Sequence, residues 1–293
     1  MKKTFLFFAV FAATALWTGC EPIVDKHDAG GSIAATELQA TATSVVKDGK
    51  NTNKVYVHCT SPVLCQWSDG VNTLSATEGY LTLLLTGEQT ITLTAMTADG
   101  TTLTKSFTVN VDDLTEPVDP AYGYLCGTGS KKWTWQSADC YGNGNPSSLA
   151  PEWSKSSITD VDGMCVAKSL PHEGTNATME FTLMGKKMVK KDADGNETPG
   201  TFNFEMKNFA VKESLWSWMD PYWSPDDPFA IGTMAFYNTN ILFPYDINYN
   251  NAVVTNYYIV SLSDTELILA AITTNQEVSW YETFYWVFVP VVE

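Results

Sequence analysis

The densest group of side chains that could contact a ligand lies in the segment from 215 to 228. Aromatic rings, carboxylates and prolines occur together there, and the residues able to face a ligand are Trp216, Trp218, Asp220, Tyr222, Trp223 and Asp226. Trp and Tyr combine a large flat apolar face with a hydrogen-bond donor. Carbohydrate rings present flat C–H faces surrounded by hydroxyl groups, so aromatic residues beside carboxylates suit them. The segment therefore predicts a proline-stiffened carbohydrate-binding loop, and packing of these rings into a loop-rich core is the alternative.

Two further tryptophans could add a second wall to such a site. Trp135 and Trp153 flank a stretch rich in Gly, Asn, Pro and Ser, which also contains Tyr141. We predict that Trp135 and Trp153 contact the ligand, although a hydrophobic core would use their rings equally well.

Signatures of catalysis are scarce in the sequence. It contains no GxSxG, HExxH or P-loop motif, and no GxGxxG after a predicted strand. Glycoside hydrolysis needs two carboxylates that flank the scissile bond. No local motif pairs any two of the candidates, which are Glu152, Glu180, Asp220, Asp226 and Asp227. We therefore predict a binding protein without catalytic residues, and a glycoside hydrolase is the alternative.

The composition argues against metal, cofactor and nucleic-acid binding. His27, His58 and His172 are scattered, and none of the cysteines lies in a CxxC pair. In the run 192–197 the glycine comes too early for a calcium-binding loop, so this run predicts a hairpin tip. The formal net charge is −16 and the chain has no arginine, which makes nucleic acid a poor partner. We expect no metal, no cofactor and no nucleic-acid partner.

The N-terminus predicts export and attachment of a lipid. Two lysines precede an almost wholly apolar run from 4 to 17, and Cys20 follows a Thr-Gly pair. This order is typical of a secretory signal, and a Cys directly after a small residue resembles a bacterial lipobox, whose Cys is acylated after cleavage. We expect a signal peptide over 1–19, lipidation of Cys20 and a tether over 20–35. An ordinary secreted protein and a single apolar anchor are the alternatives, although the run is short for a membrane span.

The other cysteines of an exported protein could form disulfides. Cys59 and Cys65 flank a short turn that contains proline, and either a local disulfide or two buried free thiols suits them. Cys126, Cys140 and Cys165 are an odd set, so at most one bridge can form among them. Cys126 and Cys140 are the closer pair in sequence.

The segment 36–113 predicts a small β-sandwich. Alternating runs rich in Thr, Val and Ile are separated by Asp-Gly turns. The stretch Gln66-Trp67-Ser68-Asp69-Gly70 and the later run Gly87-Glu88-Gln89-Thr90-Ile91-Thr92-Leu93 resemble the PKD-type immunoglobulin-like domain, although the Phe-Gly and the strand Tyr of that family are missing. The resemblance implies an immunoglobulin-like sandwich with Trp67 in its core.

A second β-rich domain is expected over 123–293, after a linker over 114–122 that two prolines and acidic residues stiffen. The runs that read as strands are 131–136, 177–183, 201–209, 257–262, 266–270 and 279–289. A length of about 170 residues without a long helical period suits a jelly roll or another two-sheet sandwich. A lipocalin-like barrel is the alternative, because the C-terminal strands follow one another as hairpins. The predicted fold class is all-β in either case.

The whole layout resembles the surface glycan-binding lipoproteins of Bacteroidota, which combine a lipobox Cys, a short acidic spacer, a PKD-like sandwich and a Trp-rich β-domain. In the second domain the resemblance rests on Lys132-Trp133-Thr134-Trp135, on the run 200–204 and on the run 257–267. It implies a lipid on Cys20 in the outer membrane, a cell-surface location, a glycan ligand and cooperation with a TonB-dependent transporter of a glycan-utilisation system. The PKD-like domain would then be a spacer. A structural or adhesive surface lipoprotein is the remaining alternative.

Overall fold

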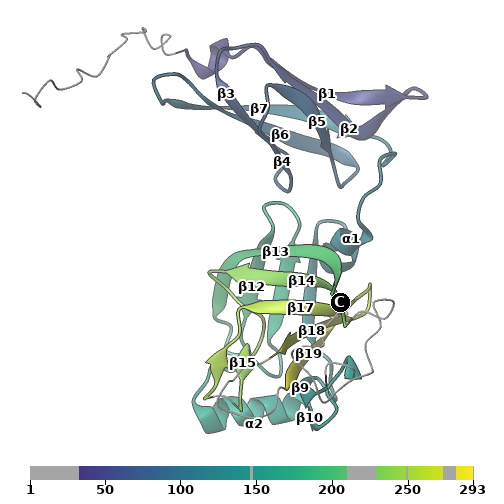
Figure 1. Cartoon of the computed structure of the whole chain (residues 1–293), viewed down its shortest axis with the longest axis vertical. Helices are drawn as coiled ribbons and strands as arrows, with labels where there is room; N and C mark the ends of the chain where they lie inside the picture. The colour runs from purple at the N-terminus through teal and green to yellow at the C-terminus, as the bar shows by residue number, and fades with distance from the viewer. Residues whose placement is uncertain (1–32, 146–147, 210–228, 249, 273–281, 293) are drawn as a thin grey trace, which may run out of the picture.

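The computed structural model describes residues 33–145, 148–209, 229–248, 250–272 and 282–292, which form two β-rich domains in succession (Figure 1). The expected signal peptide, Cys20 and most of the expected tether lie outside the described residues. Strands make up most of both domains, so the all-β prediction is confirmed. Within the described ranges, neither helix approaches the length and apolarity that crossing a bilayer would require.

The first domain consists of two antiparallel sheets, with strand orders β1-β2-β5 and β4-β3-β6-β7. A short 3₁₀ helix, η1 (Ala35–Glu37), precedes the strands, whose bounds are β1 (Ala40–Lys47), β2 (Lys50–Cys59), β3 (Leu64–Ser68), β4 (Thr73–Leu74), β5 (Glu78–Thr82), β6 (Gly87–Met96) and β7 (Thr102–Val111). Asp48 and Gly49 join β1 to β2 with φ angles of 51° and 79°. Such a left-handed pair matches the twist of a hairpin, which is why the Asp-Gly signal predicts a turn here.

Alternation along the strands directs apolar side chains into the space between the two sheets. In β2, Val55 and Val57 are fully buried, whereas the residue between them is only partly buried. Trp67 of β3 lies in the same core, where its Nε1 donates a hydrogen bond to the carbonyl of Ala76 at 3.1 Å and its ring packs on Phe107. Trp67 is therefore a core residue, as the sequence predicts.

A short helix and a direct contact join the two domains. α1 (Pro120–Cys126) begins inside the expected linker, and Asp119 caps it by accepting a hydrogen bond from the N–H of Ala121 at 2.9 Å. Proline suits the first position of a helix because that N–H would have no intrahelical partner. Elsewhere, the N–H of Gly185 in the second domain donates to the carbonyl of Gly70 in the first at 2.7 Å.

The second domain is a single antiparallel sheet that closes on itself in the order β8-β11-β12-β13-β14-β17-β18-β19. The bounds are β8 (Ser130–Trp135), β11 (Thr178–Thr182), β12 (Lys187–Lys191), β13 (Glu197–Phe209), β14 (Ala230–Tyr237), β17 (Asn256–Leu262), β18 (Leu267–Ile272) and β19 (Thr283–Pro290). β19 pairs back with β8, which places Phe288 opposite Trp135. This closed barrel is the alternative that the successive hairpins favour. The two-sheet jelly roll is corrected, because these strands form one continuous sheet.

Four short strands and one helix lie outside the closed ring. β9 (Tyr141–Gly144) and β10 (Ser154–Ser156) extend the sheet from β19, and β15 (Tyr245–Asp246) pairs with β16 (Ala252–Val253). α2 (Ile158–Lys168) runs across the lower end of the barrel (Figure 1).

The helix α2 does not show in the sequence pattern. Only Val161 and Cys165 are buried along its length, so its apolar period is too weak to distinguish it from a loop. A capping box begins it: the N–H of Asp160 donates to the hydroxyl of Ser157, and the carboxylate of Asp160 accepts from the N–H of Ser157 at 2.7 Å.

Aromatic side chains fill the interior of the barrel. The fully buried rings are Trp133, Phe181, Phe202, Tyr257, Phe284, Trp286 and Phe288. Those of Tyr257 and Trp286 meet at right angles with their centroids 5.4 Å apart. An eight-stranded barrel is just wide enough for its own side chains or for one small ligand. Here the large rings take that space, so the interior is a packed core and a larger ligand would have to bind outside it.

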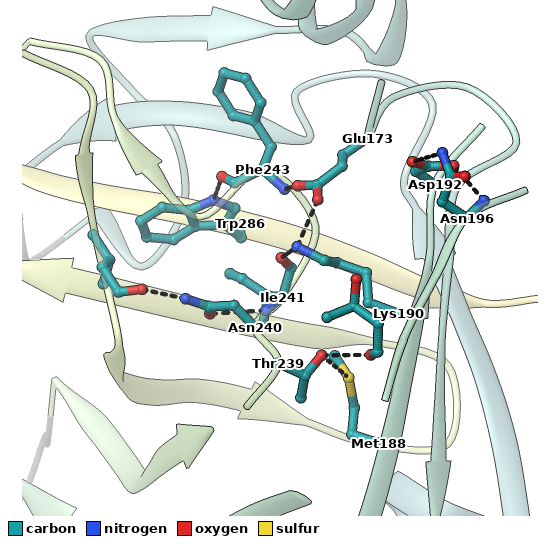
Figure 2. A network of polar contacts seen from close by, with 12 residues as sticks. Glu173, Met188, Lys190, Asp192, Asn196, Thr239, Asn240, Ile241, Phe243 and Trp286 are labelled. Carbon is teal, nitrogen blue, oxygen red and sulfur yellow. Dashed lines mark hydrogen bonds and ion pairs between the residues drawn. The ribbon is translucent and has the colours of Figure 1, made fainter. Parts of the chain in front are cut away.

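A buried polar network joins β12 to the segments around Glu173 and Phe243 (Figure 2). Lys190 points from β12 towards Glu173, and its Nζ lies 2.5 Å from one carboxylate oxygen. The other carboxylate oxygen accepts the N–H of Phe243 at 2.7 Å, and the carbonyl of Phe243 accepts Nε1 of Trp286 at 2.8 Å. Because both charged groups are almost wholly buried, this ion pair fastens the loops that carry Glu173 and Phe243 to the barrel.

Candidate ligand-binding groove

A groove of about 370 Å³ lies on the outer face of the barrel, across β13, β14 and β17. Its lining residues are Asn203, Phe204, Glu205, Phe209, Thr233, Met234, Ala235, Asn256, Tyr257 and Tyr258. Successive side chains of a strand point to opposite faces of the sheet. Since Met234 and Tyr257 are buried in the barrel core, their neighbours Thr233 and Tyr258 must point outwards.

The strand register arranges the outward side chains in two rows. Glu205 lies opposite Thr233, which lies opposite Tyr258. In the next row Asn203 lies opposite Ala235, which lies opposite Asn256. One carboxylate, one hydroxyl and two amides thus surround the small side chain of Ala235, on a floor that hydrogen-bonded strands hold in place.

An aromatic wall stands at one end of these rows. A β-bulge separates Met206 from Phe209, and the ring of Phe209 then meets Tyr258 edge to face with the centroids 5.8 Å apart. Phe229 packs on the same Tyr258 at 5.2 Å. Behind them, the outer faces of β18 and β19 add the buried residues Ile268, Ala270, Tyr285 and Val287. The wall therefore has firm apolar support.

The groove combines an aromatic surface with convergent hydrogen-bonding groups. Asn203 already accepts a hydrogen bond from Lys186 at 3.3 Å, which fixes the orientation of its amide. Glu205 is exposed and is the single carboxylate among the lining residues that the structure describes. The described lining thus offers both kinds of surface that a polar, ring-shaped ligand would contact.

The predicted ligand residues fall into three groups: six lie outside the described residues, Trp135 is buried, and Trp153 is exposed. Trp216, Trp218, Asp220, Tyr222, Trp223 and Asp226 lie outside the described residues, so their role stays a prediction. The chain enters and leaves their segment at Phe209 and Phe229, which both contact Tyr258 in the groove wall.

The two other tryptophans lie away from the groove. Trp135 is 3% exposed, its ring packs on Phe288, and its Nε1 donates to the carbonyl of Glu173 at 2.6 Å. It is a core residue, and its assignment as a ligand contact is corrected. Trp153 is 49% exposed but precedes β10, which is separated from β17 by three intervening strands. Trp153 therefore does not join the groove.

Sequence reasoning missed the groove residues themselves. Asn203, Glu205 and Tyr258 lie in runs that the sequence correctly predicts as strands. The signal was the alternation of polar side chains with Phe202, Phe204 and Met206 in one run, since it indicates which side chains face outwards. That these strands are neighbours could be known only from the barrel register.

The five described cysteines are buried free thiols. Cys59 and Cys65 are thus in the second of the two states that the sequence allows, and burial and a hydrogen bond to Cys59 raise the pKa of Cys65 to about 12. Burial also raises the pKa values of Cys126 and Cys140 to about 12. Protonated thiols of this kind are poor nucleophiles and poor metal ligands.

The described ranges also bear on metal binding by clustered His, Cys, Asp and Glu. No group of three or more His, Cys, Asp and Glu side chains is placed there to hold a metal. The run around Asp192 forms a tight turn, in which the carboxylate accepts the N–H groups of Asp194 at 3.0 Å and Asn196 at 2.8 Å (Figure 2). This geometry is that of a hairpin tip, as the sequence predicts.

Comparisons with known proteins concern the fold alone. No protein-family model and no curated protein matches the chain. Among solved structures, the chain is similar to the PKD1 domain of Epp from Vibrio anguillarum, with 18% sequence identity and a TM-score of 0.21. The match covers 25% of this chain and 94% of that domain. A TM-score this low carries no inference about function. The two-sheet sandwich of the first domain rests on its own strand pairing.

Proposed function

We propose that this protein is an exported, lipid-anchored carbohydrate-binding protein whose ligand lies in the outer groove of the barrel. The observation that carries the proposal is the groove itself, where Tyr258 and Phe209 stand beside Glu205, Asn203 and Asn256. Aromatic faces next to amides and a carboxylate match the two kinds of surface that a sugar ring presents.

In this proposal a sugar ring packs against the aromatic wall, while its hydroxyl groups bond to the polar rows. Glu205 accepts hydrogen bonds, and the amides of Asn203 and Asn256 both donate and accept. The strands hold these groups in place before the ligand arrives, so little ordering is needed on binding. Trp216, Trp218, Tyr222 and Trp223, with Asp220 and Asp226, would extend the surface from the rim of the groove. We expect a single site of this kind to bind with a dissociation constant of about 10⁻⁶ to 10⁻³ M.

The proposal also assigns a role to the other parts of the chain. In the proposal Cys20 carries the lipid in the outer membrane, the sandwich is a spacer, and the barrel presents captured glycan to a TonB-dependent uptake system. Anchoring is tested by metabolic labelling with a tagged fatty acid in a bacterial host that processes lipoproteins. The label should appear on the wild type and disappear in Cys20→Ser; equal labelling of both would refute anchoring at Cys20.

Binding is tested by affinity electrophoresis of residues 21–293, which include every described residue, in gels that contain plant, host or microbial polysaccharides. The test variant is Glu205→Ala/Tyr258→Ala, and a matched control is Glu88→Ala/Tyr80→Ala, which removes an exposed carboxylate and an exposed ring from the sandwich. Retardation of the wild type and the control by one glycan, lost in the folded test variant, would support the groove.

Other outcomes of this experiment are equally informative. Retardation that survives in Glu205→Ala/Tyr258→Ala but is lost in Trp216→Ala/Trp218→Ala/Trp223→Ala would move the site away from the groove. Absence of retardation by every glycan would refute the proposal and favour a structural or adhesive surface protein. Release of reducing sugar from a retarding glycan would instead indicate a glycoside hydrolase.

A further inference from the structure

A second polar cluster lies beside β9 and the β15–β16 hairpin, in the lower part of the barrel in Figure 1. It forms where β9 pairs with the start of β19 and where the β15–β16 hairpin meets them, since the hydroxyl of Tyr141 donates to the carbonyl of Tyr245 at 2.7 Å. Asn143 lies opposite Phe284, and Gly144 lies opposite Thr283. Asn143 therefore shares the inward face of Phe284, and the register places Asn145 beside Glu282.

Three amide oxygens of this region have no evident partner. The Oδ1 atoms of Asn143, Asn145 and Asn251 are buried, and no described residue donates a hydrogen bond to them. Asn143 is the clearest of them, because its side chain is only 8% exposed and its Nδ2 donates to Glu282. A buried carbonyl oxygen without a partner costs about 1–3 kcal/mol, so such atoms call for an occupant that the protein chain does not supply.

Two buried carboxylates approach the same place from distant parts of the sequence. Glu282 is 7% exposed and accepts a second hydrogen bond from Nδ2 of Asn248 at 2.9 Å. Asp246 is 2% exposed and accepts the N–H of Asn248 at 3.1 Å. Asn248 thus donates to both carboxylates, which brings Asp246 and Glu282 together at one residue.

The donor set of this cluster is composed of oxygen atoms. Carboxylates and amide carbonyls are the ligands that calcium prefers, and its flexible coordination tolerates an irregular arrangement of six to eight oxygens. Magnesium demands a near-ideal octahedron and keeps its waters, which a buried site of this kind would not accommodate well. From the orphaned oxygen of Asn143 beside two buried carboxylates, we infer that this cluster binds a calcium ion, with Glu282, Asp246 and the Oδ1 atoms of Asn143 and Asn145 as its ligands.

Such an ion would connect elements that no strand pairing joins. Asp246 and Asn248 belong to the β15–β16 hairpin, whereas Asn143 and Glu282 belong to the β9–β19 edge of the barrel. An ion held between them fastens the hairpin to the barrel and stabilises the folded state by RT ln(1 + c/Kd), where c is the free calcium concentration. This inference stands independently of carbohydrate binding in the groove, because the two sites share no residue.

The test is terbium luminescence of chelator-treated residues 21–293, excited through tryptophan, followed by competition with calcium. Trp286 lies 5.7 Å from Tyr141, ring centroid to ring centroid, so the site has an aromatic sensitiser nearby. We expect saturable emission that calcium displaces, together with a calcium-dependent rise in Tm. Glu282→Gln should weaken terbium binding by about tenfold or more. The control Glu88→Gln, which makes the same charge change on the sandwich, should leave it unaltered.

A second variant keeps the inference testable if Glu282→Gln does not fold. Asn143→Asp adds a carboxylate where an amide oxygen is the proposed ligand, so it should strengthen calcium binding and raise Tm only when calcium is present. In a site filled by water, the same variant would lower Tm with or without calcium. Loss of both the emission and the Tm shift in the wild type, or equal emission from the wild type and folded Glu282→Gln, would overturn the inference.

Discussion

The sandwich and the barrel both bury a core between antiparallel strands, but they differ in what fills that core. The sandwich core is mainly aliphatic, with Trp67 as its one fully buried large ring. The barrel core is dominated by aromatic rings, and a nearly buried ion pair, Glu173 with Lys190, fastens two loops to it. The spacing of two facing sheets adjusts to the side chains between them, whereas a closed ring of eight strands has a bore set by its strand number and tilt, which aromatic rings fill here.

This difference indicates where each domain can bind a ligand. A barrel whose bore is filled by its own rings must bind larger ligands on its outer surface, and there β13, β14 and β17 carry the groove around Glu205 and Tyr258. The outward positions of the sandwich strands β6 and β7 are mostly Thr and Ser, which suits a solvated spacer. Substitutions that should affect one domain and leave the other unchanged test this difference.

Truncation of a barrel tryptophan should have the largest effect. Trp135→Ala removes a buried ring that packs on Phe288, so we expect a loss of about 3–5 kcal/mol in the free energy of unfolding. The exposed Trp153→Ala is the matched control and should change it by less than about 0.5 kcal/mol. Urea denaturation of both variants measures the difference. Equal stabilities would mean that Trp135 is not a core residue and would restore it as a candidate ligand contact.

Breaking the ion pair should destabilise the barrel almost as strongly. Lys190→Met leaves the carboxylate of Glu173 buried without its cation, which typically costs about 3–5 kcal/mol. The double variant Lys190→Met/Glu173→Gln removes both charges and should recover part of that loss in a double-mutant cycle. Lys50→Met, which breaks an exposed pair with Asp113 in the sandwich, should have little measurable effect. A single variant as stable as the double one would show that the pair is not buried in solution.

The sequence was informative where side chains report on a local period. Alternation predicted β13, β17 and β19 but missed β14 (Ala230–Tyr237), and the Asp-Gly signal predicted the turn at Gly49. It could not distinguish a jelly roll from a barrel, because closure depends on β8 meeting β19, and these strands are about as far apart in the domain as two strands can be. It could not tell that Trp135 is buried for the same reason, since the residues that cover its ring come from distant strands.

Removal of one buried thiol should have a smaller effect, confined to the alkaline limb of the barrel's stability curve. Burial raises the pKa of Cys126 in the barrel to about 12, from an ordinary value of 9.0. The thiol therefore stays protonated in the folded state while it ionises in the unfolded state. Its contribution is fully present below pH 9 and is lost as the pH rises towards 12, at about 1.4 kcal/mol per pH unit.

The measurement is urea denaturation between pH 8 and pH 11 under reducing conditions. Cys126→Ala should reduce the pH dependence of the barrel transition, after allowance for the lower stability of the cavity variant at neutral pH; part of it should remain, because burial also raises the pKa of Cys140 to about 12. Unchanged slopes in the variant and the wild type would mean that Cys126 ionises equally in both states. The sandwich has a buried thiol of its own, Cys65, whose pKa is also raised to about 12, and Cys126→Ala should leave the transition of the sandwich unaltered.

The smallest expected effect concerns the helix that the sequence pattern did not reveal. Ser157→Ala removes the side chain that caps α2, so we expect a loss of about 1 kcal/mol in the stability of the barrel. Ser157→Asp keeps an acceptor at the cap and should lose less, which separates capping from any general intolerance of change at this position. Thermal unfolding by circular dichroism measures both. Because α2 leads into the loop that carries Glu173, whose carboxylate accepts the N–H of Phe243, the alanine variant should also speed amide exchange at Phe243, whereas exchange at Trp67 in the sandwich should stay the same.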